Sequence, residues 1–241
     1  LQQRPIHSPQ FSSIIKNPLM NESFQTQIEI QNKLQQNIEE IVLSIAVYEP
    51  SFIREALAND KLILNPFQLK FEPQSFWIEV HDDFTFGSLI KKFFRLKNSR
   101  IAKFIYKLYD MLLITTKLPF YKGIVGISWV TDRIFILNVQ LFASLIDIPY
   151  LQIDSALFGP NGHFTVLGFA EVTPHNFHEA GLGSFPDITE PNFKLMFHVD
   201  LKFINTELNT QTLDDIDNHY QLKTHSRINN IMNRPRYPAF S

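Results

Sequence analysis

The strongest constraint on the fold is a helical pattern followed directly by a hairpin pattern. Apolar side chains recur every three or four residues from 100 to 116, which predicts an amphipathic helix with Ser99 as its N-cap. Two strand-like apolar runs come next, over 126–130 and 133–137, and the residues between them form a turn signal. A helix and a β-hairpin in direct succession place the chain in the α+β class.

Two short helices joined by a tight turn are predicted after the hairpin. Asn138 is expected to cap the first, over 139–148, and the second is expected over 151–158. Residues 164–172 are predicted to form a strand pair around Gly168. The order of helix, hairpin, helix, turn, helix and ribbon is that of a winged helix-turn-helix, whose second short helix can enter a DNA major groove.

The segments on either side have their own patterns. Residues 1–21 are polar and contain prolines, which predicts a loose arm. A helix is predicted over 22–47, and its apolar seam either packs on its own domain or forms a homodimer contact; the seam consists of Leu34, Ile38, Ile41 and Ile45. We therefore divide the chain into an N-terminal arm and helical region (1–83), the winged-helix core (84–173) and a partly disordered C-terminal extension (174–241).

Composition excludes several classes of protein. With 44% hydrophobic and 19% charged residues, the 241-residue chain can bury a core. The chain has no cysteine, which excludes disulfides, thiolate catalysis and metal sites with cysteine ligands. No apolar run approaches the roughly 18 residues that a membrane span needs, so we expect no membrane partner.

Charge is distributed unevenly along the chain. Net charge is -2, but residues 86–172 hold ten Lys and Arg against five Asp and Glu, so they carry +5 and the remainder carries -7. Arg100, Lys103 and Lys107 are predicted to form one solvent-facing stripe on the 100–116 helix. Such a stripe suits a phosphate backbone, although an ordinary solvated face has the same pattern. Lys122 and Arg133 are further expected DNA contacts.

The helix predicted over 151–158 contains no Lys or Arg, so it cannot make the commonest base contact, Arg to guanine. Gln152 can pair with adenine, and Ser155 can contact either base type. Asn161 and His163 lie in the turn that follows. We expect sequence specificity to come from these few side chains, or else from Arg133 or from recognition of DNA shape.

No catalytic or metal site is predicted. His175, His178 and Glu179 are close in sequence but lack the His-Glu-x-x-His spacing of a zinc site. Nucleophile-elbow, Walker and dinucleotide-binding motifs are also missing from the sequence. We therefore expect a protein that is not an enzyme and that needs no cofactor.

Six short motifs stand in a fixed order along the predicted core: FIYKLYDML at 104–112, GISWV at 126–130, FILNVQLFASL at 135–145, LF at 157–158, NGHF at 161–164 and GF at 168–169. In order and spacing they resemble the initiator-binding domain of trichomonad transcription factors, which recognise the core-promoter initiator element. The resemblance implies a winged-helix protein that places the 151–158 helix in the major groove. It also implies backbone contacts from Arg100, Lys103 and Lys107.

Two functions remain open from the sequence. The first is a sequence-preferring double-stranded DNA-binding protein of the nucleus, which acts in transcription at core-promoter initiator elements together with the transcription machinery. The second is a protein-interaction module on a diverged winged helix that has lost DNA binding. Salt dependence separates the two, because phosphate contacts weaken steeply with salt and apolar contacts do not.

Overall fold

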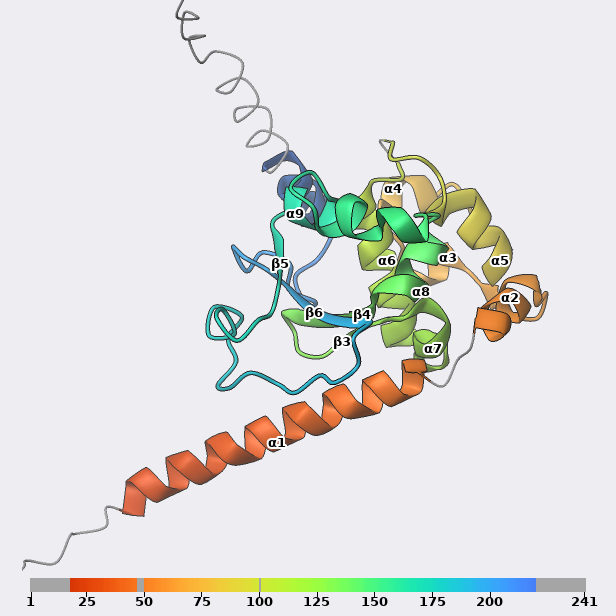
Figure 1. Cartoon of the computed structure of the whole chain (residues 1–241). Coiled ribbons are helices and arrows are strands. Elements are labelled where there is room, and N and C mark those ends of the chain that lie inside the picture. Colours follow the sequence, from red (N-terminus) through yellow and green to blue (C-terminus); the bar gives the residue numbers. More distant parts are fainter. Residues whose placement is uncertain (1–17, 47–49, 100, 220–241) are drawn as a thin grey trace, which may run out of the picture.

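The structure is a computed structural model that describes residues 18–46, 50–99 and 101–219. It confirms the α+β class. At its centre lies an antiparallel sheet in the order β3-β4-β6-β5, with helices packed around it (Figure 1). The bounds of these strands are Ile127–Trp129 for β3, Ile134–Asn138 for β4, Phe193–His198 for β6 and Phe169–Glu171 for β5.

The predicted long helix is present as α6, Phe104–Lys117. It begins four residues later than predicted, and Lys103 rather than Ser99 occupies the N-cap position. The reason is local, since the carbonyl of Ser99 accepts a hydrogen bond from Ala102 N and the chain turns there. The predicted apolar face is wrong at Ile101, which precedes the helix and is 39% exposed. Its other members are buried; they are Phe104, Ile105, Leu108, Met111 and Leu112.

The hairpin and the cap that follows it are confirmed. Strands β3 and β4 pair with Ile127 opposite Leu137. Asn138 Oδ1 accepts a hydrogen bond of 3.0 Å from Leu141 N and caps α8, Val139–Leu145. This bond satisfies one of the backbone amides that a helix start leaves unpaired.

The second short helix is confirmed as a continuous helical segment over 150–158, which we call the exposed helix. Its parts are the 3-10 turn η3, Tyr150–Gln152, and the π-helical turn η4, Asp154–Phe158.

The strand pair predicted over 164–172 is wrong in its first half. Residues His163–Val166 form the short helix α9, and only β5 is a strand. The helical turn buries Phe164 completely, among the rings of Phe104, Phe142 and Phe169. The strand that pairs with β5 is β6, from the segment assigned to the C-terminal extension.

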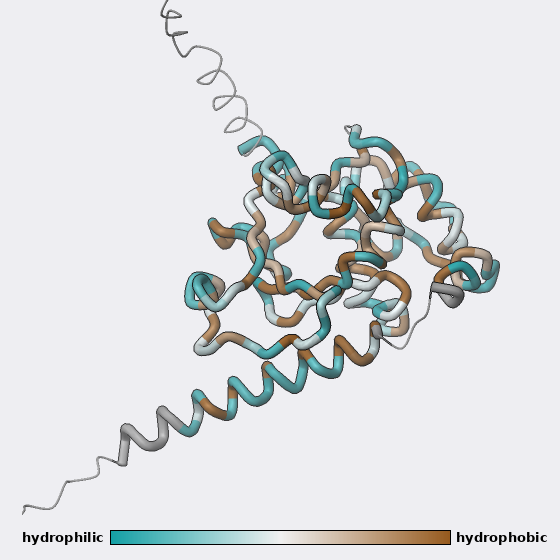
Figure 2. The backbone as a smooth tube through the Cα atoms, viewed as in Figure 1, coloured by the Kyte–Doolittle hydropathy of each residue, from teal (hydrophilic) through white to brown (hydrophobic). Residues whose placement is uncertain are grey.

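Helix α1, Pro18–Ala46, packs on its own domain through the predicted seam, because Ile38, Ile41 and Ile45 are buried. The part of α1 that precedes this seam extends away from the domain (Figure 1), and those of its residues that Figure 2 colours are mostly hydrophilic. Residue 47 and the predicted arm up to residue 17 lie outside the described residues. The homodimer contact stays a prediction.

The remaining elements are short and surround this core. Strand β1, Ile63–Leu64, pairs with β2, Phe84–Thr85. The other helical elements are α2 (Pro50–Ala58), α3 (Pro66–Leu69), α4 (Gln74–Trp77), α5 (Phe86–Leu89), the π-helical η1 (Ile90–Phe94), the 3-10 helix η2 (Pro119–Tyr121) and α7 (Lys122–Val125). A last helix covers residues 210–219, and we call it the acidic helix because it contains Asp214, Asp215 and Asp217.

In the described part of the chain, no single helix is long and apolar enough to cross a membrane. By length and composition alone, the bent pair Val139–Leu145 and Tyr150–Val166 passes the same test. In the structure, however, Leu141, Phe142 and Leu145 belong to the buried core.

Candidate nucleic-acid interface

The exposed helix has one buried side and one solvent side. Ile153 and Leu157 are buried and hold the segment on the domain. On the other side Leu151 is 93% exposed and Tyr150 is 71% exposed, the highest values among the large hydrophobic side chains of the described residues. Gln152, Asp154 and Ser155 are exposed with them. Polar and apolar groups that can contact base edges therefore share one open face.

The turn after the exposed helix is tied to α6. The ring of His163 is stacked on that of Phe104, with centroids 4.6 Å apart and an angle of 15° between the planes. Burial and the charge of Lys107 lower the pKa of His163, so this side chain is neutral at neutral pH. His163 therefore positions the turn and adds no positive charge to the surface, while Asn161 beside it is exposed.

Lys103 is engaged by two carboxylates. Its Nζ lies 2.8 Å from Asp214 Oδ1 and 3.1 Å from Asp217 Oδ2, both on the acidic helix. Burial lowers the pKa of Lys103, but its hydrogen bonds and ion pairs with the two aspartates outweigh that effect, and the pKa lies above its ordinary value. The lysine is cationic, yet its charge is matched within the chain.

Lys107 faces inward, so the predicted solvent stripe is wrong at this position. The residue is 4% exposed, and its Nζ donates hydrogen bonds to the carbonyl of Leu96 and, at 3.5 Å, to Asn98 Oδ1. Burial lowers its pKa to about 8. The stripe fails because α6 begins at Phe104, which lets the preceding loop fold over Lys107. Arg100, the third member, lies outside the described residues.

Three of the predicted contacts come together in one pocket. Lys103, Asn161 and His163 line a cavity of about 460 Å³, together with Asp217 and Asn218 of the acidic helix. Gln152 and Ser155 are not among its lining residues and lie on the exposed helix instead.

Two other predicted contacts, Lys122 and Arg133, are not among the residues that line this pocket. Arg133 is exposed in the β3–β4 turn, with its Nε 3.7 Å from Asp132 Oδ2. Lys122 is the first residue of α7 and is half-buried.

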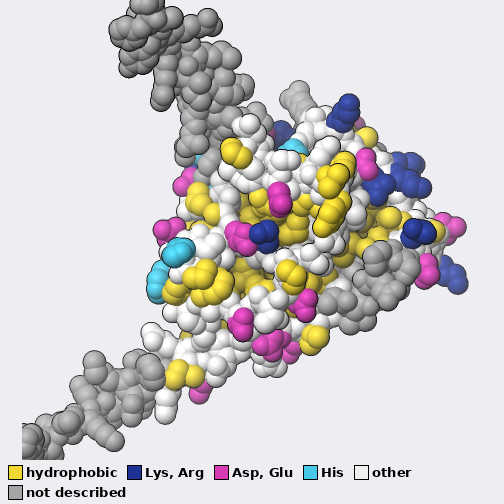
Figure 3. Space-filling model, in the orientation of Figure 1, with side chains coloured by type: hydrophobic (Ala, Val, Ile, Leu, Met, Phe, Trp, Pro, Cys, Tyr) yellow, Lys and Arg dark blue, Asp and Glu magenta, His cyan; other side chains and the backbone are white. Residues whose placement is uncertain are grey.

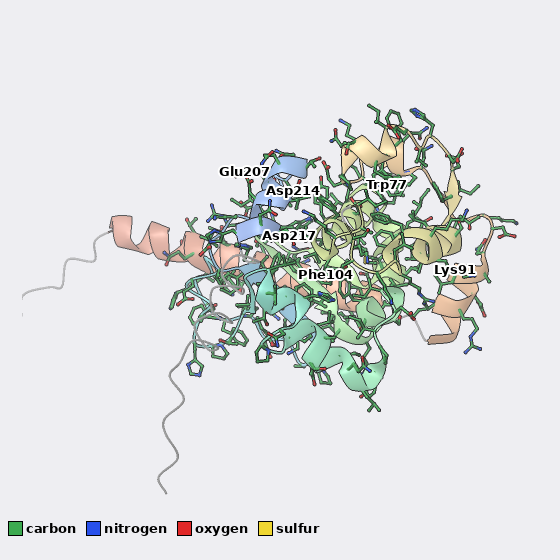
Figure 4. All side chains as sticks on the ribbon, turned by 90° about the horizontal axis from the view of Figure 1, so that it is seen from above. Trp77, Lys91, Phe104, Glu207, Asp214 and Asp217 are labelled. Atoms are coloured by element: carbon green, nitrogen blue, oxygen red, sulfur yellow. The ribbon has the colours of Figure 1, made fainter. Side chains whose placement is uncertain are left out.

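Sequence reasoning did not single out the basic group at and after η1. Lys91, Lys92 and Lys97 are exposed, and we call these three residues the η1 lysines. Figure 3 shows Lys and Arg side chains gathered on the side of the molecule where α5 lies in Figure 1. In Figure 4, Lys91 lies across the molecule from Asp214 and Asp217. These lysines contribute to the +5 charge of residues 86–172, and that surplus was the signal that could have found them.

Arg95 connects the segment that carries the η1 lysines to the end of α8. Its guanidinium donates to the carbonyls of Ser144, at 3.0 Å, and Leu145, at 3.4 Å, at the end of α8. A cation at a helix C-terminus is favourable because the helix dipole is negative there. The basic segment is thereby fixed to the helix that precedes the exposed helix in the chain.

Within the described ranges, no group of three or more His, Asp or Glu side chains is placed to hold a metal ion. His178 instead packs against the ring of Phe177.

Comparison with known proteins agrees with the motifs. The family model described as the transcription-initiator DNA-binding domain, IBD, matches residues 79–204. No curated protein and no solved structure matches the chain. The match covers more than half of the sequence and contains the whole central sheet, α6, α8 and the exposed helix, whereas the acidic helix lies beyond it. The chain therefore belongs to the family of transcription-initiator DNA-binding domains.

Proposed function

We propose that this protein binds double-stranded DNA with sequence preference at core-promoter initiator elements, acting in transcription in the nucleus alongside the transcription machinery. Membership of a DNA-binding family supports the general activity. The observation that carries the more specific proposal is the open face of the exposed helix, which presents side chains that can contact base edges.

Helix α8 and the exposed helix are proposed to act as the helix-turn-helix of a winged helix. The turn between them is tight, since Ile148 N donates a hydrogen bond of 2.9 Å to the carbonyl of Ala143. The proposed core combines residues 84–173 with β6, which comes from the 174–241 segment and lies between β4 and β5 in the sheet. Residues 1–83 and the rest of 174–241 flank this core. In this arrangement the exposed helix enters the major groove.

Base readout is assigned to the solvent side of that helix. Gln152 can form a bidentate contact with adenine, and Ser155 can reach either base type. Tyr150 and Leu151 add apolar surface that suits the methyl group of thymine. Asp154 on the same face can accept a hydrogen bond from a cytosine amino group, and it repels phosphate, which favours contact with bases over contact with the backbone.

Phosphate anchoring is assigned first to the η1 lysines, because they are exposed and are fixed to α8 through Arg95. Arg133 in the hairpin turn, Lys122 and Arg100 remain proposed backbone contacts. Lys107 is excluded from direct contact by its burial in this conformation.

The test is selection of bound duplexes from a random-sequence DNA library, followed by affinity measurements at about 50 and 200 mM salt, a range in which phosphate contacts are evident. We expect an enriched motif and a slope of log K against log salt of about -4 to -5, for roughly four to six neutralised phosphates. Absence of binding at low salt would contradict the proposal and favour the protein-interaction module.

A further inference from the structure

The acidic helix covers the one predicted phosphate contact that the structure places at the start of α6. Residues 210–219 contain three aspartates and no lysine or arginine, and they follow the end of the family match at residue 204. Figure 4 shows Asp214 and Asp217 on this helix, and Asp217 lines the same pocket as Phe104 of α6.

Two of the three aspartates bind Lys103 as phosphate oxygens would. An ammonium group has three donors, and carboxylate oxygens of Asp214 and Asp217 lie 2.8 and 3.1 Å from Lys103 Nζ. The distance to Asp214 is that of a charge-assisted hydrogen bond, and the distance to Asp217 is that of an ion pair. The Lys103 side chain is only 21% exposed, which limits screening by solvent. A DNA phosphate approaching Lys103 would have to displace these carboxylates against their charge.

The acidic helix is held in this position by other contacts as well. Leu213 and Ile216 are buried in the core. The hydroxyl of Tyr106 donates to Asp214, and the hydroxyl of Thr210 donates to Glu72. The packing of the acidic helix therefore holds both carboxylates next to Lys103 when no DNA is bound.

We propose that the acidic helix is an autoinhibitory element that lowers DNA affinity by occupying Lys103 with Asp214 and Asp217. The inference rests on the proposed DNA-binding function and extends it, since it assigns a role to a segment outside the family domain. Removing the two carboxylates frees one cation for phosphate and leaves the exposed helix unchanged.

The experiment compares D214N/D217N with D215N on the duplex selected above. Asp215 belongs to the same helix but is exposed and accepts from Gln211 Nε2 at 2.8 Å, so D215N removes charge without touching Lys103. We expect D214N/D217N to bind roughly ten- to a hundredfold tighter at 50 mM salt, the range for one charged hydrogen bond. Its salt slope should steepen by about 0.9, for one more phosphate contact. D215N should change affinity less than about twofold, because an exposed charge is screened.

Lys103→Gln is then introduced into the wild type and into D214N/D217N. With Lys103 removed, D214N/D217N should no longer bind DNA more tightly than its parent. Equal gains for D215N and D214N/D217N, or no gain for the latter while the wild type binds, would overturn the autoinhibitory contact and leave the DNA-binding function intact. Absence of binding by every variant would overturn the function itself. If circular dichroism shows the double variant to be unfolded, D217N replaces it, because it keeps the contact between Tyr106 and Asp214. Asp214 still pairs with Lys103 in this variant, so its gain in affinity should be smaller than that expected for the double variant but larger than that of D215N.

Discussion

The imidazole of His163 lies flat on the phenyl ring of Phe104, with 4.6 Å between their centroids. The same phenyl ring makes edge contacts with Phe142 of α8, at 6.1 Å, and Phe164 of α9, at 5.2 Å. One side chain therefore joins α6, α8 and the turn that ends the exposed helix. These ring contacts therefore set the orientation of the exposed helix, whose solvent side is proposed to contact the bases.

Replacing Phe104 by Ala should lower the free energy of unfolding by about 3–5 kcal/mol, the usual cost of removing a buried phenylalanine. Urea denaturation measures the change. Phe104→Leu retains most of the buried volume and is the matched control, with a clearly smaller loss. A loss below about 1 kcal/mol for the alanine variant would show that the junction does not support the fold.

The buried Lys107 predicts a pH dependence of stability. Its pKa in the fold is about 8, below the value of about 10.4 for an unperturbed lysine. Between these values the unfolded chain binds more protons, so the contribution of Lys107 to stability rises with pH across this window. Below pH 8 the cost of burying the charge is present in full.

Lys107→Met removes this titration. The stability of the wild type relative to the variant should therefore increase by on the order of 2 kcal/mol from pH 8 to pH 10.4. Urea denaturation of both proteins across that range measures the difference, in which titrations common to both cancel. A difference that stays constant with pH would show that Lys107 titrates as an ordinary exposed lysine.

Asn138 is the junction between β4 and α8, and its side chain caps that helix. Asn138→Ala should destabilise the protein by about 1 kcal/mol, since the amide of Leu141 loses its partner. Asn138→Asp supplies an equivalent oxygen and should restore most of the stability. Thermal denaturation of both variants tests the cap, and equal losses in the two would argue against it.

The position of β6 in the central sheet predicts that the domain needs residues beyond 173 in order to fold. Phe193, Leu195 and Phe197 are buried, and β6 pairs with both β4 and β5. A chain that ends at residue 173 should therefore fail to unfold cooperatively, whereas one that ends at residue 219 should retain the transition. A cooperative transition in the shorter chain would place the core within 84–173 alone.

Local patterns predicted the elements that depend on local interactions. The apolar spacing of α6, the hairpin and the Asn138 cap each involve residues within a few positions of one another, and the structure contains all three. The helical segment over 150–158 was also expected, although its 3-10 and π-helical turns leave no distinct period in the sequence.

The features that the sequence did not predict depend on contacts between residues far apart in the chain. Lys103 meets Asp214 from 111 positions away, and β5 pairs with β6 across an intervening loop that follows β5 in the chain. The burial of Lys107 depends on a loop whose path is set by the later start of α6. Periodicity reports which face of a helix is polar, but it does not report whether another segment covers that face.

The central claim is that the exposed helix reads base edges, and the most direct test is the base preference of a Leu151→Ala/Gln152→Ala variant. Both side chains are exposed, so the fold should survive. In the duplex selection, we expect the variant to lose preference at one or two adjacent positions, with a loss of about 1–3 kcal/mol on the wild-type site. As a control, Lys91→Gln/Lys92→Gln should weaken binding to all sequences alike and reduce the salt slope. An unchanged motif and affinity in the Leu151/Gln152 variant would contradict the account.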